Sequence, residues 1–218
     1  YYRFAQANGD FSVSIGVASQ SLGDGGMAVG GLSFASSNAA AAGHRSAAWG
    51  SFSSAFGVFA KAGGNGGYAA NGNLILNDFT NDRTTAIGAG SMAGAGAEGQ
   101  TDATAIGYNA QANAVRGLAL GANSRAVADN AVAIGQASVA EEALTVSIGR
   151  SSTPFTPGFT RRIVNLAAGT ADTDAVNVAQ LNAALADADS LCRGGACPGT
   201  CGPARRRDRS NSRSRCAA

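Results

Sequence analysis

Short segments of alternating large apolar and small residues recur along the middle of the chain. Within each segment Val132 and Ile134 would fall on one face and Ala131 and Ala133 on the other, which is the periodicity of a β-strand. Each such segment ends in an aliphatic residue followed by glycine. This pair recurs every fourteen residues, at Ile106-Gly107, Leu120-Gly121, Ile134-Gly135 and Ile148-Gly149. The pattern predicts a series of short strands, each ended by a turn.

Glycine opens each predicted turn, in the pattern Gly-x-x-(Ala/Ser)-x-(Ala/Ser). Glycine supplies the positive φ or the close backbone approach that a sharp turn needs. The pattern alone is a weak signal, because Ala and Ser are so frequent here, and the evidence lies in the spacing. Successive steps are 14, 13, 14, 31, 19, 14, 14 and 14 residues. The repeat turn glycines predicted in this way are Gly16, Gly30, Gly43, Gly57, Gly88, Gly107, Gly121, Gly135 and Gly149.

The two long steps predict insertions at residues 63–82 and 93–100. We expect the first to hold one irregular coil plus a loop, and the second a shorter loop. A fourteen-residue unit cannot bury a core alone, so two strands per unit are expected to form one coil of an all-β, parallel β-roll solenoid. About nine coils would give a rod roughly 40 Å long. Its core of Ala, Val and Ile would be thin, so several chains are expected to associate, with the Ala faces allowing close approach.

The repeat is predicted to end at residue 150. Two prolines and a glycine in residues 151–158 interrupt strand pairing. Further on, Val178, Leu181, Leu185 and Ala188 are spaced 3, 4 and 3 residues apart, as at the start of a coiled-coil seam. Asp172 or Asp174 is expected to cap this helix. Barely two heptads follow, which predicts that a longer stalk has been cut off.

Composition supports a repetitive fold over a globular enzyme. The 218 residues include 48 Ala and 31 Gly, while only 14% are charged and 6% aromatic, so few large side chains can fill a core. Glycine does not recur at every third position, which argues against collagen. We expect no signal peptide and no transmembrane helix in this sequence. A start at Tyr1 predicts that an N-terminal part is left out.

The net charge of +2 is the sum over two regions of opposite charge. Residues 1–191 carry nine basic and thirteen acidic side chains, whereas residues 192–218 carry seven Arg and one Asp. All four cysteines, Cys192, Cys197, Cys201 and Cys216, lie in the second region. Their spacing fits no common zinc finger. We interpret 192–218 as a disordered tail, frameshifted or foreign in origin, rather than as a zinc or nucleic-acid site.

The fourteen-residue repeat and residues 161–181 together resemble the trimeric autotransporter adhesins with a YadA-like head. The second segment resembles the neck of that family, Arg-x-Ile-x-Asn-Val-Ala-Ala-Gly followed by Thr-Asp-Ala-Val-Asn-Val-x-Gln-Leu, and departs from it at Leu166, where Val is usual. The resemblance covers about residues 12–185. It divides the chain into a head at 1–150, a neck at 151–181 and the start of a coiled-coil stalk at 182–191.

The resemblance implies a left-handed roll in each chain and a homotrimer. It also implies attachment to host cells or to matrix proteins such as collagen, fibronectin or laminin, and exposure at the bacterial cell surface through an outer-membrane anchor beyond this fragment. No nucleic-acid partner is expected. The neck and trimer-forming residues that it implies are Arg161, Ile163, Asn165, Gly169, Asp174, Val176, Asn177, Val178, Gln180, Leu181 and Leu185.

Catalytic chemistry finds little support in the sequence. His44 is the only histidine, so His-based metal sites and Ser-His-Asp triads are nearly excluded, and we expect it in a turn. Glu141 and Glu142 are expected to lie at a solvated edge. Residues 63–67 lack the Gly-Lys-Ser/Thr ending of a phosphate loop. The aromatic group of Trp49, Phe52, Phe56 and Phe59 is expected to pack in the core or at its edge. We therefore predict no catalytic, cofactor-binding or metal-binding residue.

Three alternatives to an adhesin remain at this point. A hexapeptide-repeat acyltransferase also has Ile-Gly followed by small residues, but its period is six and its coils are triangular. A flat ice-binding face would need a ladder of Thr, where this repeat has Ala and Ser. A purely structural surface spacer would have the same repeat without a ligand.

Overall fold

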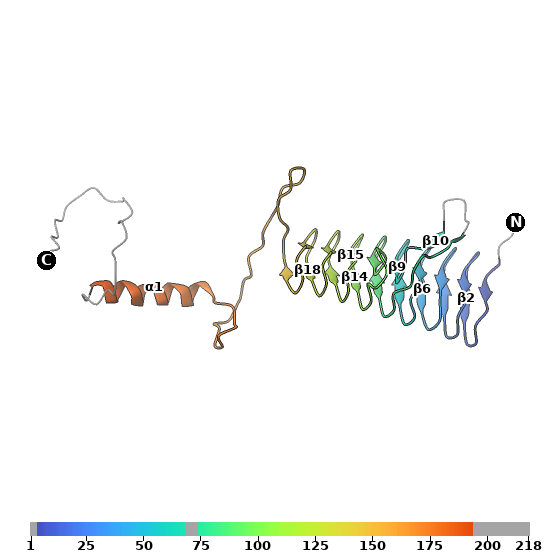
Figure 1. The fold of residues 1–218 in the computed structure, drawn as a ribbon, viewed down its shortest axis with the longest axis horizontal. Coiled ribbons are helices and arrows are strands. Elements are labelled where there is room, and N and C mark those ends of the chain that lie inside the picture. The colour runs from blue at the N-terminus through green and yellow to red at the C-terminus, as the bar shows by residue number, and fades with distance from the viewer. Residues whose placement is uncertain (1–3, 69–73, 194–218) are drawn as a thin grey trace. The chain divides into compact units, whose positions relative to one another are not determined.

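The structure is a computed structural model that describes residues 4–68 and 74–193. The chain divides into two compact units between Arg161 and Arg162 (Figure 1). The first unit is a parallel β-solenoid, coloured blue to yellow in Figure 1. The second contains an extended segment and one helix, α1 (Val178–Arg193). The predicted tail at 192–218 lies outside the described residues from residue 194 onward.

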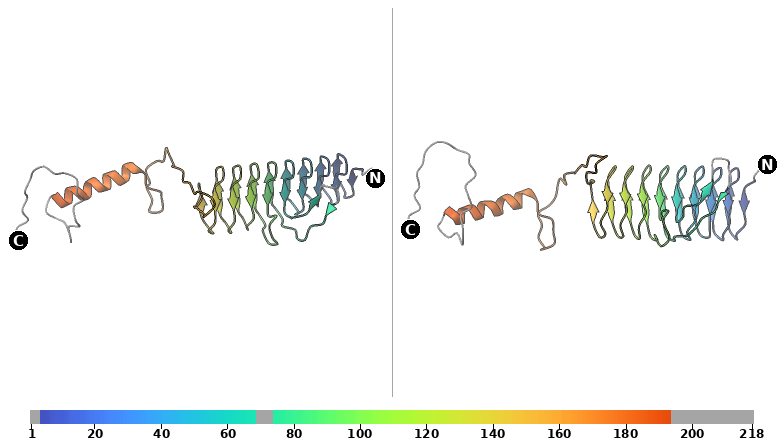
Figure 2. Two further views of the ribbon diagram at one scale, coloured as in Figure 1. Left: turned by 90° about the horizontal axis from the view of Figure 1, so that it is seen from above. Right: turned by 45° about the horizontal axis from the view of Figure 1, so that its top comes forward.

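The solenoid is built from two nine-stranded parallel sheets, each receiving one strand from every coil. One sheet has two-residue strands: β1 (Gln6–Ala7), β3 (Gln20–Ser21), β5 (Phe34–Ala35), β7 (Ala47–Ala48), β9 (Lys61–Ala62), β13 (Met92–Ala93), β15 (Gln111–Ala112), β17 (Arg125–Ala126) and β19 (Val139–Ala140). We call this the short-strand sheet. The other, the long-strand sheet, contains β2 (Val13–Ile15), β4 (Met27–Val29), β6 (Ala40–Ala42), β8 (Ser54–Phe56), β12 (Thr85–Ile87), β14 (Thr104–Ile106), β16 (Leu118–Leu120), β18 (Val132–Ile134) and β20 (Val146–Ser147). The two views in Figure 2 show these strands stacked coil on coil.

The core between the sheets is made almost entirely of alanine. The central residue of most long strands, such as Ala105, Ala119 and Ala133, is fully buried, and each lies in register with the next. The second residue of most short strands, such as Ala112 and Ala126, is equally buried. Only side chains as small as those of alanine and serine fit between the two sheets of so narrow a coil. The prediction that Ala faces allow chains to approach one another is therefore wrong, because these faces meet inside a single chain.

Glycine stacks on glycine at one corner of the coil. Gly16, Gly30, Gly43, Gly57, Gly88, Gly107, Gly121 and Gly135 all have positive φ. A Cβ on Gly107 would lie 2.6 Å from the carbonyl carbon of Gly121. Any other residue at this position would therefore combine an unfavourable backbone conformation with a steric clash. Gly149 differs, since it is not among the positive-φ residues and it faces the backbone of Phe159 instead.

Buried serines complete the glycine corner. Ser33 and Ser124 are fully buried, and each hydroxyl donates to the carbonyl of the glycine three residues earlier, over 2.8 and 2.7 Å. The residue just before the serine adopts the left-handed region, as Asn123 does at φ 57 and its counterpart Asn109 does at φ 52. Asparagine tolerates this conformation better than most residues, and the two asparagine side chains also bond to each other over 3.1 Å. The repeat pattern thus records the small side chains that a tight corner requires.

The longest step does not add a coil. Strand β12 pairs directly with β8, and β13 pairs directly with β9. Residues 63–82 therefore leave the roll and return to it, with the antiparallel pair β10 (Gly67–Tyr68) and β11 (Leu74–Ile75) in the excursion. The expected irregular coil in this insertion is wrong. The roll tolerates the excursion because the strands on either side still find their neighbours in register.

The second unit is organised around Gln180 and Asn177. Asn177 Oδ1 accepts from the amide of Gln180 over 3.0 Å, while Gln180 Oε1 accepts from the amide of Asn177 over 3.2 Å. This reciprocal pair is a capping box at the start of α1. The prediction that Asp172 or Asp174 caps the helix is therefore wrong. Asp174 instead accepts from the amides of Thr170 and Ala171 and closes the turn before the helix.

Candidate functional site

The outer face of the long-strand sheet is largely apolar along the roll, with Ser54, Thr85 and Thr104 as hydroxyl-bearing neighbours near its middle. Since the middle residue of each strand points inward, the two flanking residues form two outward columns. The first column is Val13, Met27, Ala40, Ser54, Thr85, Thr104, Leu118, Val132 and Val146, and the second is Ile15, Val29, Ala42, Phe56, Ile87, Ile106, Leu120 and Ile134. We call these two sets the first column and the second column. The strands of this sheet contain no charged residue.

Large side chains in these columns remain exposed in the single chain. Ile15 is 59% exposed, and Ile87, Leu120 and Ile134 are each close to 40% exposed. A soluble monomer seldom leaves so long a contiguous apolar face open to water, and such a face marks an interaction surface. The seam of α1 is equally open, because Val178, Leu181 and Leu185 are all more than half exposed. Each unit thus presents its own uncovered apolar stripe.

The outer face of the short-strand sheet is mixed and is partly covered. Phe34 and Trp49 stack there with ring centroids 3.8 Å apart, and Leu74 from the insertion packs against the cluster of Phe34 and Ala47. Lys61 Nζ donates to the carbonyl of Asn65 over 2.8 Å, and burial lowers the pKa of this amine. The insertion is therefore bound against the roll. Farther along the same face the outward positions are mixed, with Met92 and Val139 on either side of the polar Gln111 and the basic Arg125.

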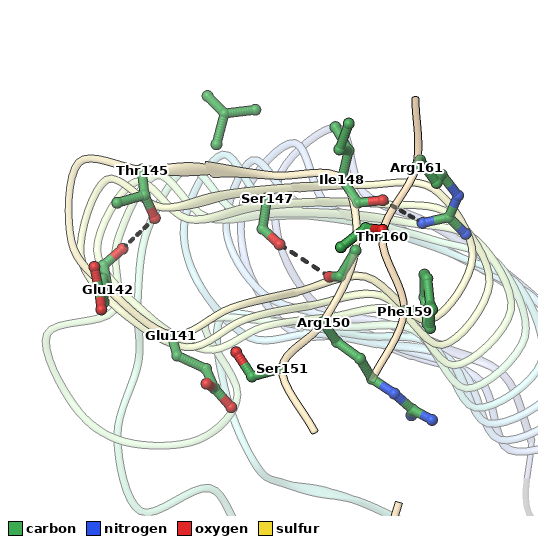
Figure 3. Close-up of a pocket in the computed structure, with 12 residues that line it drawn as sticks. Glu141, Glu142, Thr145, Ser147, Ile148, Arg150, Ser151, Phe159, Thr160 and Arg161 are labelled. Carbon is green, nitrogen blue, oxygen red and sulfur yellow. Dashed lines mark hydrogen bonds between the residues drawn. The ribbon is translucent and has the colours of Figure 1, made fainter. Parts of the chain in front are cut away.

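The C-terminal end of the roll forms a shallow hollow of about 500 Å³ (Figure 3). Arg161 crosses it and donates to Ser138 Oγ, to Gln136 O over 2.7 Å and to Ile148 O. Its guanidinium also lies 4.6 Å from the ring centroid of Phe159. Arg161 therefore supplies donors to the last coil, where the amides of a further strand would otherwise stand.

The acidic groups of this hollow do not form a paired-carboxylate site. Figure 3 shows Glu141 and Glu142 pointing apart, and both side chains are exposed. Thr145 Oγ1 donates to the carbonyl of Glu142 over 2.7 Å, which is a turn contact. The expectation of a solvated edge agrees with this geometry. Among the described residues, no group of three or more His, Cys, Asp and Glu side chains could hold a metal ion.

The histidine and the aromatic residues considered in the sequence analysis lie in turns, in the outward columns or in packing contacts. His44 lies edge-on to Phe59, with centroids 6.1 Å apart, at the turn corner. Phe52 and Phe59 occupy turn positions with positive φ and are 66% and 48% exposed, so they do not belong to the core. Phe56 lies in the second column, and only Trp49 packs under a covering segment.

Charged side chains pair along a different corner of the coil from the glycines. Arg83 and Asp102 form an ion pair at 2.6 Å, and Arg116 Nε donates to Asn130 Oδ1 over 2.7 Å. The hydrogen bond from Arg83 holds the pKa of Asp102 below its ordinary value, and the same bond raises the pKa of Arg83. Both groups are on the surface, so this ladder ties neighbouring coils together with little effect on stability.

The neck residues expected from the sequence occupy two settings. Gln180 and Asn177 join distant parts of the segment: Gln180 Nε2 donates to Gly169 O over 2.8 Å, and Asn177 Nδ2 donates to Leu166 O over 3.2 Å. Asn165 adopts the left-handed conformation at φ 58. By contrast, Ile163 and Val176 are each about two thirds exposed in the single chain. The sequence did not reveal that Gln180 holds both the helix and the segment before it.

Comparison with known proteins adds the family. A model described as the YadA head domain repeat matches residues 5–33, 100–124 and 126–152, and a second, described as the coiled stalk of trimeric autotransporter adhesin, matches residues 162–194. The chain belongs to the trimeric autotransporter adhesins. Its solenoid is a YadA-like head, and the stalk match begins at the boundary between the two compact units.

One solved structure supports the same assignment. The collagen-binding domain of the Yersinia adhesin YadA is 29% identical over 84% of this chain and 87% of that one, with a TM-score of 0.65. No curated protein matches this adhesin sequence. Within the described part of the adhesin chain, no helix has the length and apolar character needed to cross a membrane.

Proposed function

We propose that this chain forms a homotrimer whose heads attach a bacterium to host cells or extracellular matrix. The observation that carries the trimer is the largely apolar outer face of the long-strand sheet, whose large side chains from Ile15 to Val146 remain exposed. Three copies placed around an axis parallel to the roll would bury this face against itself. The exposed seam of Val178, Leu181 and Leu185 would be buried by helices of the same two partner chains, since both units belong to one chain.

The matrix ligand follows from the likeness to the YadA domain, which binds collagen. The chain covers most of that domain, and its short-strand sheet would face outward in a trimer closed through the long-strand sheet. A repeated outward surface in three copies would raise avidity even if each site is weak. We place this head at the bacterial surface, held there by an outer-membrane anchor, as in other members of the family.

Sedimentation and plate binding test the two parts separately. Velocity sedimentation of the full chain under reducing conditions should give a trimer, and a folded monomer would overturn the assembly. Trimeric protein should then bind immobilised collagen, fibronectin or laminin saturably. A trimer that binds none of these and no host cells would leave the role of a structural spacer.

An enzymatic role is the weaker alternative. The two-sheet coil differs from the triangular coil of a hexapeptide-repeat acyltransferase, so that comparison loses its structural basis. His44, which such an enzyme would need as a base, packs against Phe59 at a turn corner. We therefore propose that the head acts by binding and not by catalysis.

A further inference from the structure

Each coil of the roll has a corner at either end of its long strand. The glycine corner follows the strand, and the corner that carries Arg83 and Asp102 precedes it; we call the second one the charged corner. One residue of the charged corner, two positions before the strand, has positive φ in every coil. These residues are Phe11, Gly25, Asn38, Phe52, Arg83, Asp102, Arg116, Asn130 and Leu144. Gly, Asn and Asp tolerate this conformation, whereas it is strained in a bulky apolar residue.

Phe52 combines this strain with exposure to water. It has φ 58 and is 66% exposed in the single chain. Asn38 occupies the same position one coil earlier and suits the backbone better. A strained residue that is also large, apolar and exposed marks a contact made outside the chain.

The glycine corner of the same coil is also apolar. Val58 and Phe59 lie there, nearly half exposed, and β8 separates them from Phe52. The first coil repeats the arrangement, with Phe11 at its charged corner and Val17 at its glycine corner, 97% and 74% exposed. Large apolar side chains thus stand open to water at both ends of the same two coils.

Polar and small residues replace them at both corners in the coils that follow. The coils of β12, β14 and β16 have Arg83, Asp102 and Arg116 at the charged corner, and Gly90, Asn109 and Asn123 at the position equivalent to Phe59. Tyr108, beside Asn109, is the one aromatic residue at the corners of these three coils, and it carries a hydroxyl. Leu144 in the last coil has no such counterpart, because the chain leaves the roll after Gly149. The two corners of these coils therefore change character together, as expected if they meet each other across an interface.

A rotational trimer brings unlike corners together at the same level. In the proposed assembly the long-strand faces point at an axis parallel to the roll, so the two corners of each head lie at its two sides. Rotation about this axis does not shift a copy along it. The charged corner of a coil therefore meets the glycine corner of the same coil in the next copy, and the three contacts close into a ring. Phe52 of one head would thus lie beside Val58 and Phe59 of the next.

We infer that Phe52 of each head packs against Val58 and Phe59 of the neighbouring head, and that Phe11 and Val17 make the same kind of contact in the first coil. The occupant of this surface is a second copy of the chain. Burial of these side chains compensates for the backbone strain at Phe52. The inference rests on the proposed homotrimer and adds to it the contacts by which neighbouring heads meet at their sides.

Disulfide cross-linking tests which corners meet. The pair Phe52→Cys/Phe59→Cys is made in the full-length chain with its four native cysteines replaced by serine, and the oxidised protein is run on a denaturing gel without reductant. We expect covalent dimers and trimers. Each single variant should give only monomer, because equivalent corners lie on different sides of the heads. Phe52→Cys/Asn109→Cys joins the same two corners two coils apart, so this control should also give monomer.

Phe52→Asn tests whether the contact stabilises the trimer. Asparagine suits the left-handed backbone, as at Asn38, but it removes the apolar contact. We expect the chain concentration at which half of the trimer dissociates to rise about tenfold, as measured by velocity sedimentation of a dilution series. Phe155→Asn is the matched control, since Phe155 is 95% exposed and lies outside both corners. It should leave that concentration unchanged.

Circular dichroism establishes that each variant is folded, and Phe52→Asn decides the matter if the cysteine pair does not fold. A trimer whose Phe52→Cys/Phe59→Cys pair links no better than the control pair, or whose dissociation is unchanged by Phe52→Asn, would overturn the inference alone. A wild-type chain that sediments as a folded monomer would overturn the proposed trimer and, with it, the inference.

Discussion

Arg161 Nη1 donates a hydrogen bond to Ser138 Oγ over 2.8 Å, across the open end of the last coil. The two residues are 23 positions apart, and Ser138 belongs to the same column of corner residues as Ser124 and Ser33. In every earlier coil the next glycine corner stacks on this place. At the end of the roll a guanidinium takes over that position, and it also packs on Phe159.

Replacement of Arg161 by alanine should therefore loosen the end of the roll. We expect a loss of about 1–2 kcal/mol, since several hydrogen bonds to a charged group and an aromatic contact are removed. Thermal unfolding followed by circular dichroism measures the loss. Arg162→Ala is the matched control, because it removes the same kind of side chain at the next position without touching these contacts. Equal effects of the two substitutions would show that Arg161 does not cap the roll.

The glycine column should tolerate alanine far less well than an isolated glycine does. Gly107 combines φ 131 with a closed space against Gly121, whereas Gly99 has φ 86 and open space within 4 Å of the position that a Cβ would take. We expect Gly99→Ala to cost about 1 kcal/mol from backbone strain alone. Gly107→Ala should cost more than about 3 kcal/mol, because neighbouring coils must also move apart. Chemical denaturation distinguishes them, and similar losses would contradict close stacking.

Gln180→Ala should release both ends of the neck interaction. The substitution removes the Oε1 acceptor for Asn177 N and the Nε2 donor to Gly169 O. A lost capping interaction costs about 1 kcal/mol, and helix content should fall at the same time. Asn182→Ala, on the exposed surface of α1, serves as control. Unchanged helicity in the Gln180 variant would argue against the capping box.

Acid should weaken the turn before α1 through Asp174. Backbone amides, first that of Ala171 and then that of Thr170, hold the pKa of this carboxyl below its ordinary value. Because the folded-state pKa is lowered, the stabilisation is fully present above the ordinary pKa of about 4. It is lost as the pH falls through the lower pKa of the folded state. Amide chemical shifts of Thr170 and Ala171, followed by NMR from neutral to acidic pH, should move together with this ionisation. Asp174→Asn should abolish that shared titration.

The coil can be predicted from the sequence because two requirements of its structure restrict the residue type at fixed positions. Glycine must stand where φ is positive and the next coil is close, and a methyl-sized residue must stand between the sheets, so Gly107 and Ala105 recur with their period. Alternation alone does not say which face is inside. The larger Ile134 is the natural choice for a core, yet the narrow coil admits only Ala133 and leaves Ile134 outward.

Long-range contacts set the remaining limit on prediction. Leu74 packs on Phe34 across an insertion, and Arg161 reaches Ser138 and Gln136 over more than twenty residues. No local pattern encodes such pairs. Asp174 and Asn177 are both plausible caps by residue type, and only the position of Gln180 three residues after Asn177 separates them. The trimer contacts expected of the exposed neck residues stay predictions, since they concern a neighbouring copy.

The direction of the hydrogen bonds in the roll has a mechanical consequence. Each coil is bonded to the next along the axis of the solenoid, through parallel pairs such as Ile106 with Leu120 and Leu120 with Ile134. A force that pulls the two ends of a single roll apart therefore loads one pair of neighbouring coils at a time. The coils should separate in sequence and not all at once. Under tension the coils at the two ends, each with a neighbouring coil on one side only, would be the first to open, and each further coil would lengthen the tether by about fourteen residues of chain.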